Sequence, residues 1–144
     1  MTLRTALPRP DLDGLRLLEP GRPDVWLIFG GERHRIASSA VYDALFSEVE
    51  GLVPYQGVER ILLGPELEEG TCLIRADEGL SIYLLARAGN GEVQRHFIPT
   101  YESLLDFRFD EAKVRAVSPL VIEGLNEGAD LTSAADRDRR VESR

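Results

Sequence analysis

The sequence is poor in the residues that build metal and redox centres. Its 144 residues include one cysteine, Cys72, and two histidines, His34 and His96. A single cysteine cannot form an internal disulfide or a multi-thiolate zinc or iron–sulfur site. We therefore expect no cofactor and no metal, with His34 and His96 as the only candidate metal ligands.

Long apolar runs are also missing. No stretch approaches the ~18 apolar residues of a membrane span, and the first residues contain no apolar segment that could act in secretion. With 43% hydrophobic and 29% charged residues, the composition is typical of a soluble globular protein. We therefore predict a cytoplasmic protein without a membrane partner.

Positive charge is scarce as well. The chain has 17 basic and 25 acidic residues, a net charge of −8 and a pI of about 4.8. All the basic residues except Lys113 are arginines, and they are mostly dispersed along the chain. An acidic protein without a basic patch is a poor ligand for phosphate backbones, so we expect no nucleic-acid partner.

Motifs of known catalytic sites are absent. The chain has no G-x-S-x-G, G-x-x-x-x-G-K-[ST] or H-E-x-x-H, and no G-x-G-x-x-G after a strand. A histidine-activated nucleophile would have to be Ser38, Ser39 or Thr100, which have a local role as helix caps. We therefore predict that the chain is not an enzyme. The alternative is a small hydrolase-like enzyme with His34 or His96 as general base.

What the sequence does contain is an internal repeat. The same G-x-x-L pattern begins at Gly14, Gly70 and Gly128. Two further segments recur in the same order: 25–28 (Val-Trp-Leu-Ile) with 82–85 (Ile-Tyr-Leu-Leu), and 33–36 (Arg-His-Arg-Ile) with 95–98 (Arg-His-Phe-Ile). These matches predict a single domain over residues 1–144 that contains repeats 14–69 and 70–131.

Each repeat has the pattern of a β-hairpin followed by a short helix. In the first, an apolar strand precedes Gly30-Gly31 and a returning strand, with a helix over 40–46. In the second, Asn90-Gly91 provides the turn, and the helix covers 101–106. We expect an α+β fold in which the two units share one core around a pseudo-two-fold axis, in one β-rich sheet or small barrel.

The chain ends differ in composition from the repeats. Residues 1–11 contain two prolines and predict an N-terminal arm. Residues 132–144 have almost no apolar content and mixed charge, so we expect a flexible charged tail.

Five residues of the predicted strands are candidates for ligand binding. Trp26 and Tyr83 could form aromatic platforms, and Arg33, Arg35 and Arg95 could form an anion-binding patch. Simpler roles stay open, namely core packing for the aromatic rings and ion pairing for the arginines.

The two histidines have a simple role of their own. His34 and His96 share strand faces with isoleucines, which favours buried imidazoles that bond backbone carbonyls.

The segments 26–38 (Trp-Leu-Ile-Phe-Gly-Gly-Glu-Arg-His-Arg-Ile-Ala-Ser) and 95–99 (Arg-His-Phe-Ile-Pro) resemble uncharacterised bacterial tandem-repeat modules. In those modules a strand and a tight hairpin lead into an (Arg/Lys)-His-Ile-(Pro/Ala)-Ser segment and a short helix. The resemblance covers roughly residues 14–131 and implies binding or interaction rather than catalysis. No functional residue is carried over from it.

Together these observations predict a non-catalytic binding module. It would recognise a small molecule, a sugar or a protein partner through its hairpin turns and strand faces. A third possibility is a self-assembling structural protein, such as a homodimer, because open sheet edges readily pair.

Overall fold

The structure is a computed structural model that describes residues 5–142, and its strands form two mixed sheets. The first sheet contains β1 (Arg16–Leu18), β2 (Val25–Phe29), β3 (Glu32–Arg35) and β4 (Leu52–Pro54). The second contains β5 (Cys72–Ala76), β6 (Ile82–Arg87), β7 (Val93–Ile98), β8 (Arg115–Val117) and β9 (Asn126–Glu127).

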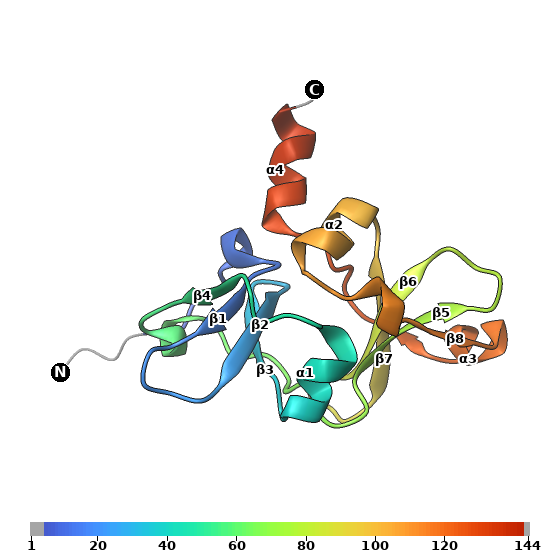
Figure 1. Cartoon of the computed structure of the whole chain (residues 1–144), viewed down its shortest axis with the longest axis horizontal. Helices are drawn as coiled ribbons and strands as arrows, with labels where there is room; N and C mark the ends of the chain where they lie inside the picture. Colours follow the sequence, from blue (N-terminus) through green and yellow to red (C-terminus); the bar gives the residue numbers. More distant parts are fainter. Residues whose placement is uncertain (1–4, 143–144) are drawn as a thin grey trace.

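Short helices connect these strands. The α-helices are α1 (Ser39–Leu45), α2 (Tyr101–Asp106), α3 (Pro119–Glu123) and α4 (Ala134–Glu142). The 3-10 helices are η1 (Pro10–Leu12), η2 (Val58–Arg60) and η3 (Glu111–Lys113). In Figure 1 the two sheets stand side by side with α1 between them. The fold is therefore α+β, as the sequence predicts.

The two sheets share one pattern of strand pairing. β1 pairs antiparallel with β2 and parallel with β4, and β5 pairs antiparallel with β6 and parallel with β8. The hairpins β2–β3 and β6–β7 extend each sheet on its other side. Corresponding strands can therefore be compared residue by residue. The boundaries of the sequence repeats stay a prediction.

The expectation of one sheet or a small barrel is wrong, because the strands form two separate sheets. The hairpin edges β3 and β7 do not pair with each other. The outer edge of β3 is bridged by Leu63 and Leu67, which lie opposite Arg33 and Ile36. The outer edge of β7 pairs with β9. An edge with its hydrogen bonds satisfied cannot accept a strand from the other sheet, so the sheets meet through side chains.

Local chemistry explains why the hairpins and helices lie where the sequence predicts them. Gly30 and Gly31 have φ of 61° and 75°, the left-handed conformation that a two-residue hairpin turn needs. Ser38 caps α1 by accepting a hydrogen bond from the Val41 amide at 3.3 Å. Thr100 caps α2 in the same way, with the Ser103 amide at 3.0 Å.

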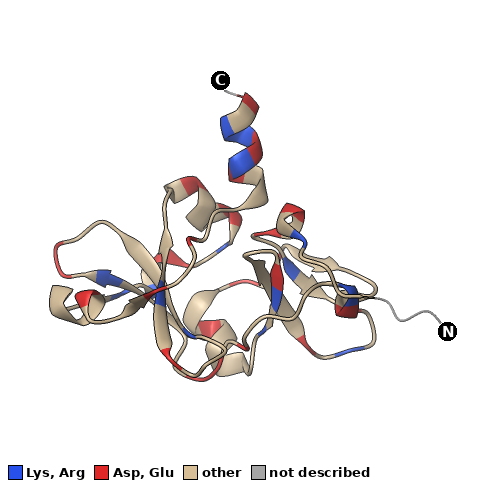
Figure 2. Cartoon of the chain, turned by 180° about the vertical axis from the view of Figure 1, so that it is seen from behind, with Lys and Arg blue, Asp and Glu red and all other residues tan. Residues whose placement is uncertain are grey.

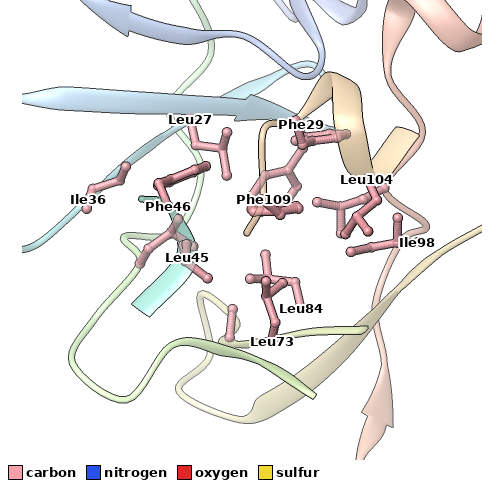
Figure 3. Packing of buried hydrophobic residues seen from close by; sticks show 14 of the residues in the cluster. Leu27, Phe29, Ile36, Leu45, Phe46, Leu73, Leu84, Ile98, Leu104 and Phe109 are labelled. Atoms are coloured by element: carbon pink, nitrogen blue, oxygen red, sulfur yellow. The ribbon is translucent and has the colours of Figure 1, made fainter. Parts of the chain in front are cut away.

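One apolar core joins the inner faces of both sheets to α1 and α2. Figure 3 shows side chains of the first sheet opposite those of the second, with Phe46 and Phe109 between them. The ring centroids of Phe46 and Phe109 are 5.5 Å apart, and those of Phe107 and Phe109 are 5.3 Å apart. The core also contains Leu27, Phe29, Ile36, Val41, Leu45, Leu67, Leu73, Leu84, Ala86, Ile98, Leu104 and Leu131.

The outer face of each sheet has a smaller core of its own. In the first sheet, Leu17 and Ile28 are buried with Val58 and Ile61, and Trp26 packs against them. In the second, Cys72, Ile74 and Ile122 form the centre, and Tyr83 packs against them. Both faces of the central strands are therefore apolar, which explains their nearly continuous hydrophobic sequence.

The strand pairing changes the sequence alignment of the repeats at the first strand. Trp26 pairs with Leu17, whereas Tyr83, its counterpart, pairs with Ile74. Leu17 therefore corresponds to Ile74, and the buried Arg16 takes the place of Leu73.

The segment that begins at Gly128 also has a different counterpart. It corresponds to Gly64–Leu67 and not to the segments that begin at Gly14 and Gly70. The backbone hydrogen bonds match: Gly64 N–H to Arg33 O, Leu67 N–H to Arg35 O, Gly128 N–H to Arg95 O and Leu131 N–H to Phe97 O. Residues 128–131 thus end the second half and do not begin a third copy.

Arg16 is a charged residue that is only 1% exposed. Its guanidinium donates to the carbonyls of Glu48 (2.8 Å) and Glu50, and it lies 4.9 Å from the centre of the Phe46 ring. Burial lowers the pKa of Arg16 from its ordinary value. Carbonyl acceptors compensate for the loss of water, so the charge is accommodated beside the core.

The N-terminal arm is hydrogen-bonded to the first half of the chain at Leu7 and Arg9. The Leu7 amide donates to the Arg60 carbonyl at 3.0 Å, and the Arg9 amide donates to Gly31 at 2.8 Å. Residues 1–4 lie outside the described residues.

Residues 134–142 of the expected flexible tail form helix α4, which projects from the body (Figure 1) and carries alternating basic and acidic residues (Figure 2). Asp136 anchors its first turn, since its carboxylate accepts hydrogen bonds from Thr100 (2.7 Å) and Ser103 (3.0 Å) of the α2 region. No local pattern in residues 132–144 indicates that Asp136 contacts Thr100 and Ser103, because these residues are more than 30 positions away in the chain. Residues 143–144 lie outside the described residues.

No helix within residues 5–142 combines the length and the apolar character needed to cross a membrane.

Asp136→Ala should weaken the attachment of α4, which Arg137 also ties to Asp13 (2.9 Å). Loss of the two hydrogen bonds, one buried and one partly buried, should lower the free energy of unfolding by about 1–3 kcal/mol, measured by urea unfolding and by far-ultraviolet circular dichroism. Burial opposes the charge, but the hydrogen bonds of Thr100 and Ser103 hold the pKa of Asp136 below its ordinary value. The stabilisation that the Asp136 carboxylate gives to the folded state is therefore complete above the ordinary carboxyl pKa. It is lost as the pH falls through the lower pKa that Asp136 has in the folded state.

The matched control is Asp138→Ala, an exposed position of the same helix. It should change stability by less than about 0.5 kcal/mol. Equal effects of the two substitutions would contradict the anchoring role of Asp136.

Candidate functional site

The two histidines occupy corresponding positions on β3 and β7. His34 is 3% exposed, and its Nδ1 lies 2.8 Å from the carbonyl oxygen of Pro65. Nδ1 of His96 lies 2.8 Å from the carbonyl oxygen of Ala129. Each imidazole thus ties the segment that follows a glycine to its sheet.

The preceding glycines make room for these rings. A Cβ atom on Gly64 would lie 2.5 Å from Cε1 of His34, and one on Gly128 would lie 2.4 Å from Cε1 of His96. These distances are far below van der Waals contact. A histidine on the strand and a glycine on the adjoining segment are therefore required together in both halves.

Burial makes His34 a weak base. It lowers the pKa of His34 to about 4, against the opposing effect of the Pro65 and Phe29 carbonyls. Burial likewise lowers the pKa of His96. Nε2 of His34 faces the Phe29 carbonyl at 3.1 Å, while the nearest carboxylate oxygen, on Glu32, is 4.0 Å away. This geometry gives little support to His34 as a general base.

No group of three or more potential metal ligands lies together among residues 5–142.

The aromatic candidates each lie beneath an arginine. The guanidinium of Arg33 lies 4.5 Å from the centre of the Trp26 ring, and that of Arg95 lies 5.7 Å from the Tyr83 ring. Such cation–π contacts contribute about 0.5–2 kcal/mol each. The structure thus groups four of the five predicted site residues into two corresponding pairs.

The two pairs differ in their hydrogen bonds. Nε of Arg33 donates to the carbonyl of Ile61 at 2.9 Å. Nη2 of Arg95 donates to Glu127 at 2.9 Å, but its buried Nε has no hydrogen-bond partner in the described part of the chain. A buried N–H without an acceptor costs about 1–3 kcal/mol. The second pair therefore has an unused donor.

A pocket of about 210 Å³ opens beside Tyr83 and Arg95. We call it the β6–β7 pocket. Its lining consists of Ser81, Tyr83, Arg95, Phe97, Glu127, Gly128 and Asp130. The aromatic rings of Tyr83 and Phe97 are 5.6 Å apart and tilted by 45°, so they form one apolar wall.

In the first sheet, the corresponding residues form ion pairs. Arg35 lies at the position of Phe97 and bridges Asp24 (2.9 Å) and Glu66. Residues 24 and 66 correspond to Ser81 and Asp130. Since a phenylalanine cannot bridge Ser81 and Asp130, their polar groups face the pocket without that partner.

Arg35 itself borders a different hollow. This larger, mainly apolar pocket of about 410 Å³ lies between the start of β2 and the start of α1. The five residues predicted for one ligand surface are thus distributed over three places: Trp26 with Arg33, Tyr83 with Arg95, and Arg35 with its carboxylates.

Sequence reasoning missed Phe97, Ser81 and Asp130. Strand alternation could have found the first two, because Ser81 shares a face with Tyr83, and Phe97 shares one with Arg95. Asp130 lies far along the chain from these strands, and no local pattern indicates that it reaches them.

The chain matches no protein-family model, no curated protein and no solved structure. The resemblance to bacterial tandem modules therefore stays a prediction, and the function has to be argued from the geometry.

His34 should make the stability of the fold depend on pH. The unfolded chain binds a proton near pH 6.5, but the folded chain does so only near pH 4. Stability is therefore complete above pH 6.5 and falls toward pH 4, by about 2 kcal/mol at pH 5. Urea unfolding at pH 7.5 and pH 5 measures this difference.

His34→Gln, which keeps an N–H donor for Pro65, should show a pH dependence smaller by that amount. Asp138→Ala retains both histidines and should show the full dependence. An unchanged pH dependence in His34→Gln would show that the buried imidazole does not cause it.

Proposed function

We propose that the chain is a non-catalytic binding module that recognises one hydroxyl-rich ring, such as a sugar residue, in the β6–β7 pocket. The observation that carries the proposal is the combination of an aromatic wall with the unpaired, buried Nε of Arg95. The carboxylate of Glu127 is engaged by Arg95 at 2.9 Å, which favours a binding role over catalysis for that side chain.

The aromatic wall supports a ring as the ligand. Tyr83 and Phe97 present apolar faces from adjacent strands, and Tyr83 adds a hydroxyl. A planar apolar surface with a polar edge suits the face of a pyranose ring, which carries C–H groups on its face and hydroxyls around its rim.

The polar lining supports a ligand that both donates and accepts hydrogen bonds. Arg95 offers an N–H donor, Asp130 offers acceptors, and the Ser81 hydroxyl can act in either way. A ligand hydroxyl that accepts from Nε would remove the cost of the unpaired donor. The carboxylates of Glu127 and Asp130 beside Arg95 disfavour an anionic ligand.

The size of the pocket limits the ligand to about one ring. Its volume of about 210 Å³ is below the roughly 300–1,000 Å³ of pockets for drug-sized ligands. We therefore expect a monosaccharide unit or a polyol of similar size, bound weakly on its own.

The proposal also includes three further expectations: a pseudo-two-fold relation between the two halves, a cytoplasmic location and formation of a homodimer. The corresponding positions of Tyr83 and Trp26 support the first, because both lie on the outer face of a central strand under an arginine.

The proposal predicts binding of a neutral sugar or polyol in a glycan array or a thermal-shift screen. For the ligand so found, Arg95→Gln should weaken binding at least ~10-fold because a donor is lost. Phe97→Arg should do the same, because the new side chain would bridge Ser81 and Asp130 across the pocket. Isothermal titration calorimetry measures both effects.

The matched control is Arg33→Gln, the same change at the corresponding position of the first sheet. It should leave affinity unchanged. Two blank screens would refute the proposal, as would equal losses of affinity in Arg33→Gln and Arg95→Gln.

A further inference from the structure

A second pocket lies where the two halves meet and contains both histidines. Its volume is about 220 Å³. Its lining includes Phe29, Glu32 and His34 from the first half and Ala86, Gln94 and His96 from the second. We call it the junction pocket. It shares no residue with the β6–β7 pocket, so it is independent of the function proposed above.

A difference between corresponding positions accounts for this space. Phe29 pairs with Glu32 across the first hairpin, and Ala86 pairs with Gln94 across the second. The Phe29 ring stacks on His34 with centroids 3.6 Å apart and planes 3° from parallel. Because Ala86 has no ring at the corresponding position, His96 lacks the equivalent stacking partner.

Two hydrogen-bond acceptors at this pocket have no donor. Nδ1 of His96 donates to Ala129, which leaves the lone pair on Nε2, and Nε2 has no partner in residues 5–142. The carboxylate of Glu32 accepts no side-chain hydrogen bond in the same part of the chain, and the titratable group beside it is the imidazole of His34, at 4.0 Å.

The other residues of the lining are an engaged arginine and several apolar side chains. Arg87 also lines the pocket, but its guanidinium is engaged by the Gly91 carbonyl (2.7 Å) and by Glu68 (3.3 Å). The rings of Phe29 and His96 make an edge-type contact, with centroids 5.4 Å apart and planes inclined by 63°. Phe29, Leu67 and Ala86 make much of the wall apolar.

We propose that the junction pocket is a binding site for a small organic amine, in which a cationic N–H group is attached to an apolar ring. The ammonium donates hydrogen bonds to Nε2 of His96 and to the Glu32 carboxylate, which also balances its charge. The ring fills the space beside Ala86 and contacts Phe29. The net charge of −8 further favours cations over anions.

Benzylamine is the probe, with benzyl alcohol and benzoate as ligands of the same ring but without the positive charge. Nuclear magnetic resonance titration of the ¹⁵N-labelled full chain should show saturable shifts for benzylamine at the amides of Ala86, Ala88 and Gln94. Benzyl alcohol should bind at least ~10-fold more weakly, and benzoate should not bind.

Two variants test the residues. Glu32→Gln introduces the residue that the second half carries at the corresponding position, and it should weaken benzylamine binding at least ~10-fold. Ala86→Phe should abolish binding by filling the pocket. Its thermal unfolding shows whether it folds, and if it does not, Glu32→Gln decides alone. Glu123→Gln removes one exposed negative charge elsewhere and should leave binding unchanged.

The proposal is overturned if benzylamine causes no saturable shifts at the junction pocket or if benzoate binds as well as benzylamine. It is also overturned if Glu123→Gln weakens binding as much as Glu32→Gln, since the attraction would then be a general effect of net charge. None of these results affects the sugar-binding proposal, which uses other residues.

Discussion

The apolar layer between the two sheets is the constraint on which the rest of the structure depends. A unit of about 57 residues would bury only about 60% of the surface of its unfolded chain, which makes a stable fold on its own marginal. Leu27 of the first sheet and Leu84 of the second are both 0% exposed, because each inner face is covered by the other half and by the phenylalanines between them. Each half therefore completes the core of the other.

Within this frame, the histidines, the glycines and Lys113 act as long-range ties. His34 and His96 fix the segments that pair with the edges of the two sheets, and Gly64 and Gly128 allow their rings to approach. Lys113, the single lysine, lies in the second half and donates to the Phe46 carbonyl at 2.7 Å, after the end of α1. The carbonyls of Pro65, Ala129 and Phe46 are thus satisfied by side chains distant in sequence.

The candidate sites arise where corresponding positions differ. Arg35 joins two carboxylates in the first sheet, and its counterpart Phe97 leaves an aromatic pocket open. Phe29 covers His34, and its counterpart Ala86 leaves His96 facing a hollow. Both pockets therefore result from replacing a space-filling or bridging side chain in one half only, with the framework around it unchanged.

The sequence by itself determined the α+β class, the hairpins, the capped helices and the buried position of His34, whereas His96 is only partly buried. These features depend on local chemistry, such as the left-handed turn at Gly30 and the hydroxyl caps before α1 and α2. Only the tertiary structure decided that the strands form two sheets, that residues 128–131 correspond to residues 64–67 and that Asp136 anchors α4. Each of these depends on hydrogen bonds between residues far apart in the chain, which no local pattern encodes. The pockets also required the strand pairing, because it shows which side chains correspond.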